Sequence, residues 1–179
     1  MRTTRMMIAG AVALAVMLAP GAATAQSADT EDLPLPAHWS GSVTSGPRFA
    51  VPGTEAELFP WGNRTTVGLT YTNESDDPRA TGDVALVFTV DWSGGNQMGR
   101  GSGLARLVNQ GGSFEGPLNV IYYPDGSEFR MALMDGKDGF EGLTYSMTNY
   151  LDPLGRGQSQ GLIWEGEMPP IPDAEALPD

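Results

Sequence analysis

The sequence predicts an all-β protein: an antiparallel meander of about eight strands that closes into a barrel, with one long loop after the first strand. Three observations predict this fold. Short runs of alternating apolar and polar residues recur along the chain, turn sequences rich in Gly, Pro, Asn and Asp separate them at nearly even spacing, and no segment beyond residue 25 has helical periodicity. Consecutive short turns favour a meander of sequence neighbours over a sandwich with crossovers.

The clearest hairpin lies in the middle of the chain. Two alternating runs, 118–123 and 128–134, flank the turn Pro124-Asp125-Gly126. Proline pre-sets φ for the second position of a type I turn, and glycine takes the left-handed position that closes a bulged hairpin. With a three-residue turn, we expect Val120 to pair with Arg130.

The other strands are predicted from the same alternation and punctuation. The expected strands are 38–44, 65–72, 83–92, 101–109, 118–123, 128–134, 140–147 and 157–168. Closure of the barrel would pair the first strand with the last. The connection from Ser45 to Arg64 holds three prolines and three glycines, but its apolar residues indicate that it packs onto the domain, as a lid over one barrel mouth.

The two ends of the chain are predicted to lie outside the barrel. Residues 1–25 have a basic start, an apolar run and a small-residue end, the pattern of a secretory signal peptide, so we expect a periplasmic or secreted protein. Residues 26–37 read as a flexible N-terminal linker, 38–168 as a single β-barrel domain and 169–179 as a disordered tail. The chain has no cysteine, so it can form no disulfide.

The charge of the chain restricts its partners. Removing Arg2 and Arg5 with the signal peptide changes the formal net charge from −12 to −14. Such a field repels nucleic acid and anionic membrane surfaces, and it is compatible with a neutral, apolar or cationic ligand. No stretch after the signal reaches the roughly 20 apolar residues of a membrane span.

The two faces of the central hairpin are both largely apolar. One face carries Tyr122 and Arg130, and the other carries Ile121, Phe129 and Met131. One can line the barrel, and the other then needs cover from the 45–64 connection, a partner subunit or a membrane-like ligand, which makes a homo-oligomer an open alternative. Arg130 inside would require a carboxylate or an anionic ligand, so we expect it on the outer surface.

A search for catalytic and metal-binding residues finds no recognisable set. His38 is the only histidine, and it lies beside the linker. Asp135, Asp138 and Glu141 do not follow the spacing of a calcium loop. Glu115 and Glu141 have the right type for paired carboxylates, but nothing places them together. We therefore predict no metal and no cofactor, and we assign no catalytic residue.

Four glycine-rich stretches carry a resemblance to known barrels. SDDPRATG (75–82), GRGSG (99–103), GGSFEG (111–116) and DGKDGFEGLTY (135–145) resemble a group of uncharacterised exported bacterial proteins and, more distantly, the allene oxide cyclase and dirigent type of eight-stranded barrel. The resemblance spans residues 65–168 and implies a barrel that can hold an apolar cavity. Those distant families include cyclases, proteins that steer radical coupling and barrels with no known reaction, and they are often trimeric. No residue set here matches their active sites.

Two functions remain, and the sequence leaves open whether the protein is an enzyme. The favoured one is an exported binding or interaction module for a small apolar ligand or partner. The alternative is an allene oxide cyclase-like or dirigent-like isomerase or cyclase that folds a small apolar substrate inside the barrel. The candidate ligand-binding residues are Tyr122, Arg130, Tyr145 and Glu115.

Overall fold

The computed structural model describes residues 33–59, 62–93 and 98–166, and in these ranges every regular element is a β-strand. The strands are β1 (Ala37–Ala50), β2 (Glu57–Phe59), β3 (Gly62–Ser75), β4 (Gly82–Ser93), β5 (Gly99–Val108), β6 (Ser113–Tyr122), β7 (Glu128–Lys137), β8 (Leu143–Leu151) and β9 (Arg156–Glu165). No described helix is long and apolar enough to cross a membrane.

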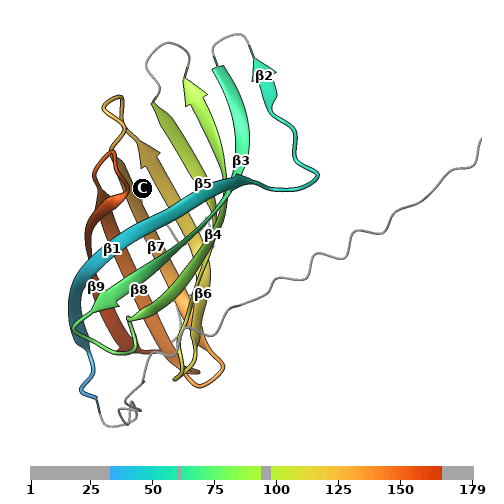
Figure 1. The fold of residues 1–179 in the computed structure, drawn as a ribbon. Helices are drawn as coiled ribbons and strands as arrows, with labels where there is room; N and C mark the ends of the chain where they lie inside the picture. The colour runs from blue at the N-terminus through green and yellow to red at the C-terminus, as the bar shows by residue number, and fades with distance from the viewer. Residues whose placement is uncertain (1–32, 60–61, 94–97, 167–179) are drawn as a thin grey trace, which may run out of the picture.

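Eight of the strands form a closed antiparallel barrel (Figure 1). From β3 to β9 each strand pairs with the next one in the chain, and β1 closes the ring by pairing with β9 on one side and β3 on the other. The predicted meander and the predicted pairing of first and last strands are both confirmed. The short strand β2 is additional and pairs only with β3.

The central hairpin adopts the predicted register. Val120 pairs with Arg130, and the Tyr123 amide donates to the Ser127 carbonyl oxygen at 2.9 Å. Gly126 has a φ of 86°, in the left-handed region that favours glycine. The local turn chemistry therefore sets which side chains of β6 and β7 share a face.

The connection after the first strand is shorter than predicted, because β1 continues to Ala50 and β3 begins at Gly62. A register shift between Ser45 and Arg48 redirects β1. Up to Thr44 the strand pairs with β9, and beyond the shift it pairs with β3 alone. In Figure 1, β1 crosses the barrel obliquely and leads to β2 at the outer edge of β3. Its second half extends the β3 side of the barrel as a strand, where we had predicted a loop.

Aromatic rings fill the lower half of the barrel, the half nearest the β3–β4, β5–β6 and β7–β8 turns. Trp39 stacks on Tyr145 with a centroid distance of 5.1 Å, Tyr145 on Phe114 at 4.9 Å, and Phe114 on Phe140 at 4.8 Å. All four side chains are buried. This half is a packed aromatic core, in which Trp39 Nε1 and the Tyr145 hydroxyl have no hydrogen-bond partner among the described residues.

The second apolar face of the hairpin lies on the outside of the barrel. Met131 and Tyr150 are about half exposed there, and Val87 pairs across β4 and β5 with the exposed Leu104. The 45–64 connection does not cover this face, since β1 and β2 pair with β3 and β9.

The ends of the domain fall partly within the described residues. Leu35 packs against the core, just before β1. The predicted signal peptide, most of the predicted linker and the predicted tail lie outside the described residues.

Candidate functional site

A layer of polar side chains crosses the upper half of the barrel, on the side of the β6–β7 and β8–β9 turns. Strand alternation turns every second residue inward, and at this level the inward positions are polar on several strands. The layer contains Ser45 of β1, Tyr71 of β3, Glu128 and Arg130 of β7, Asn149 of β8 and Ser159 of β9.

The centre of the layer is an ion pair within one strand. The Arg130 Nε and Nη2 atoms both donate to Glu128 Oε2, at 3.1 and 2.7 Å. The Arg130 side chain is fully buried and the Glu128 side chain is 4% exposed. Burying either charge alone would be strongly unfavourable, and the ion pair offsets the cost of burying both side chains.

The Arg130 guanidinium reaches across to the strands that close the barrel. Nη2 also donates to the Ser45 hydroxyl at 3.1 Å, and the guanidinium carbon lies 5.4 Å from the centre of the Tyr71 ring. The third nitrogen, Nη1, is buried and has no hydrogen-bond partner among the described residues. A buried donor without an acceptor costs about 1–3 kcal/mol, so an oxygen atom placed beside Nη1 would be stabilising there.

A second arginine joins the layer from the far half of β1. Arg48 forms an ion pair with Glu128 Oε1, and its guanidinium carbon lies 4.7 Å from the centre of the Tyr122 ring. Unlike Arg130, the Arg48 side chain is 46% exposed. Glu128 thus joins one buried and one accessible guanidinium.

Aromatic rings surround this charged group. Tyr122 packs against Trp92 with a centroid distance of 4.9 Å and against Phe88 at 6.4 Å. The Trp92 indole nitrogen donates to the Thr65 hydroxyl at 2.9 Å, which fixes the ring. The Arg48 guanidinium therefore lies over a buried ring, that of Tyr122, which packs against Trp92 and Phe88.

A hydrogen-bond chain supports the layer from below. The Ser159 hydroxyl donates to Asn149 Oδ1 at 2.5 Å, Asn149 Nδ2 donates to the Tyr71 hydroxyl at 3.0 Å, and that hydroxyl donates to the Met147 sulfur at 3.1 Å. Such chains hold each side chain in one orientation. They keep the Tyr71 ring in place beside Arg130.

The two tyrosines of the layer remain neutral well above physiological pH. Burial raises the pKa of Tyr71 to about 12, against the opposing effect of the Arg130 charge. Burial and the nearby Glu128 charge raise the pKa of Tyr122 to about 12. Neither phenol is suited to act as a general base near neutral pH.

The structure brings together only two of the four predicted site residues. Tyr122 and Arg130 both lie at the polar layer, whereas Tyr145 belongs to the aromatic stack below and Glu115 is exposed on the outside. The predicted outward orientation of Arg130 is wrong, because Glu128 supplies the carboxylate that an interior arginine needs.

Sequence reasoning missed several members of the site. Glu128 could have been found, since it shares the face of Arg130 two residues away. Arg48 gave no signal, because it lies 80 residues from Glu128 and its strand was predicted to have ended. Tyr71 and Asn149 looked like ordinary members of alternating strands.

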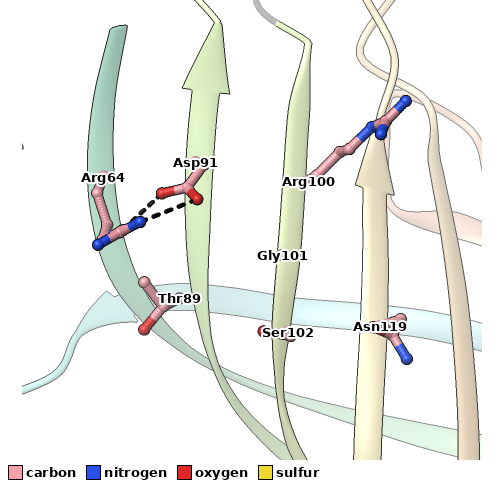
Figure 2. Close-up of a pocket in the computed structure, with 7 residues that line it drawn as sticks. All are labelled: Arg64, Thr89, Asp91, Arg100, Gly101, Ser102 and Asn119. Carbon is pink, nitrogen blue, oxygen red and sulfur yellow. Dashed lines mark hydrogen bonds and ion pairs between the residues drawn. The ribbon is translucent and has the colours of Figure 1, made fainter. Parts of the chain in front are cut away.

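A depression lies on the outer surface, and Figure 2 shows the residues that line it. This depression of about 540 Å³ lies over β3 to β6 and is lined by Arg64, Thr89, Asp91, Arg100, Gly101, Ser102 and Asn119. Arg64 donates to both Asp91 oxygens, at 2.6 and 3.1 Å, and neither side chain is buried. The described residues of the depression include no buried hydrogen-bond donor that lacks a partner, whereas the polar layer contains Arg130 Nη1. The polar layer is therefore the stronger candidate site.

Comparisons with protein-family models, curated proteins and solved structures found no match. Within the described ranges no three His, Asp or Glu side chains are grouped as a metal site would require. The candidate site therefore stands on its own geometry.

Proposed function

We propose that this protein is an exported binding module that holds a small, largely apolar molecule at the upper end of its barrel. The single observation that carries the proposal is the buried Nη1 atom of Arg130, a strong donor without a partner among the described residues. A ligand oxygen would complete its hydrogen bonding. The neighbouring Tyr122 and Trp92 rings would contact the apolar part of the same molecule.

The site favours binding over the cyclase-like alternative. The Arg130 and Glu128 charges are engaged with one another, and the two phenols hold their protons to about pH 12. Proton transfer near neutral pH needs a group with a pKa near neutrality, which neither Tyr71 nor Tyr122 has. The signal-like residues 1–25 support the proposed export.

Binding can be tested with N-phenyl-1-naphthylamine, a neutral apolar dye whose emission rises in an apolar site. We expect saturable binding to the purified protein and a rise in its melting temperature. Ser45→Leu removes an acceptor of Arg130 and places a larger side chain in the layer, so it should abolish saturation.

Ser42→Leu is the matched control, because Ser42 lies on the same strand and is exposed. It should bind the dye as the wild type does. Thermal melts establish that both variants fold. Absence of saturable binding and of a melting shift in the wild type would contradict the proposal, as would equal binding by the Ser45→Leu variant.

A further inference from the structure

The charges of the upper layer point to the chemical class of the ligand. We infer that the bound molecule carries an anionic oxygen group, such as a carboxylate, that binds between Arg130 and Arg48. This inference rests on the proposed function and specifies the head group that the site selects.

The charge balance of the layer is positive. Two guanidiniums, Arg48 and Arg130, face one carboxylate, Glu128. Tyr71 and Tyr122 pack against these arginines and contribute no negative charge at neutral pH. The layer therefore carries one more positive charge than negative charge, although the formal net charge of the whole chain is −12. An anion would neutralise the positive charge that the half-exposed Arg48 adds beside the balanced Arg130–Glu128 pair, whereas a neutral ligand would not.

The donors left over also fit an anion. Two nitrogens of Arg130 are fully used by Glu128 and Ser45, which leaves Nη1. Hydrogen bonds from a guanidinium to a charged oxygen are shorter and stronger than those to a neutral one. The interior already contains one such acceptor, Glu128, and a ligand carboxylate would be the second.

Arg48 supplies access from solvent. Its side chain is 46% exposed, and it lies on the half of β1 that pairs only with β3. Arg48 thus provides the outer contact, and the buried Arg130 provides the inner one. The acidic exterior of the protein repels anions in general. A ligand that binds selectively therefore needs both an apolar body and an anionic group that the two arginines attract.

The test compares two ligands of nearly equal shape, 1-naphthaleneacetate and its neutral amide. Calorimetry with the wild-type protein should show the acid binding at least about tenfold more tightly, a difference of about 1.4 kcal/mol. The preference should shrink as salt is raised. Arg48→Gln should remove most of the preference, measured as the ratio of the acid and amide affinities within that variant.

Arg106→Gln is the matched control. Arg106 is 50% exposed and also pairs with one carboxylate, that of Asp138, but it lies on the outer face of β5. It should keep the full preference for the acid. Two results would overturn the inference and leave the proposed function standing. In the first, the wild type binds the dye but binds the acid and the amide with equal affinity. In the second, Arg48→Gln and Arg106→Gln lose the preference for the acid to the same extent. Failure of the dye itself to bind would overturn both.

Discussion

Arg130 and Glu128 lie two residues apart on the inner face of β7, with Nη2 2.7 Å from Oε2, so one strand carries both members of a buried ion pair. Their positions make Glu128 the link between an interior guanidinium and Arg48, which comes from the strand that closes the barrel. The stability of the closed barrel should therefore depend on this pair.

We expect Arg130→Met to lower the free energy of unfolding by about 3 kcal/mol, because it removes the principal partner of a buried carboxylate. Glu128→Gln should be similarly costly. The double variant should lose clearly less than the sum of the two single losses, since no buried charge is left without a partner; Arg48, which also loses Glu128, is 46% exposed. Urea unfolding measures all three. Strict additivity would show that the two side chains do not stabilise one another.

The buried tyrosines predict a loss of stability in alkali. An unfolded tyrosine ionises near pH 10, whereas folded Tyr71 and Tyr122 ionise near pH 12. Their stabilisation is thus present below pH 10 and is lost as the pH rises towards 12, by about 2–3 kcal/mol for each tyrosine.

Urea midpoints between pH 8 and 11.5, with phenolate absorbance on the folded protein, measure this dependence. Tyr71→Phe should make the alkaline slope shallower. An unchanged slope in that variant would refute the assignment of the effect to Tyr71.

Gly157 is expected to tolerate no side chain. A Cβ there would lie 1.8 Å from the Tyr150 carbonyl oxygen, so backbone would have to move. Gly157→Ala should cost about 3 kcal/mol or more, in the range of overpacked sites. Gly68→Ala is the control, because the three atoms nearest its Cβ all belong to the ring of Phe49, a side chain that is 51% exposed and can turn away. Thermal unfolding of both variants tests this prediction: Gly157→Ala should melt at a lower temperature than Gly68→Ala. Equal melting temperatures would contradict it.

Asp76 should govern part of the acid response. Its carboxylate accepts hydrogen bonds from the Ser40 amide at 2.8 Å and the Ser40 hydroxyl at 2.9 Å, and these bonds lower the pKa of Asp76 below its ordinary 3.8. The stabilisation is present above pH 3.8 and is lost as the pH falls further.

Asp76→Asn should therefore flatten the decline of the urea midpoint between pH 4 and 2. Glu115→Gln, on the exposed outer face, controls for the change in net charge and should leave that decline as in the wild type. A steep acid decline in the Asp76→Asn protein would show that other carboxylates produce it.

The fold was predictable because its signals are local. Alternation along each strand and the turn at Pro124-Asp125-Gly126 act within a few residues, and they determined the meander and the pairing of Val120 with Arg130. The length of β1 was not predictable in this way. Beyond its bulge, β1 is stabilised by pairing with β3, which no local pattern reveals.

The site was only half predictable for a related reason. Alternation assigns Tyr122 and Tyr145 to a face of their strands but left open which face lines the barrel. The structure turns both inward, and the stagger of tilted strands places one in the polar layer and the other in the aromatic stack. The orientation of Arg130 depended on Glu128 and on Ser45, and the second of these comes from a distant strand.

The place of β1 in the barrel has a consequence for assembly. Its partner β9 is the last strand, so ring closure joins the two ends of the domain and belongs to the slow, non-local class of folding events. The local hairpins from β3 to β9 can form earlier. Since β1 also brings Ser45 and Arg48, the upper layer is complete only when the ring closes. Ligand binding would then report the final step of folding, and a ligand present during refolding would trap the closed ring.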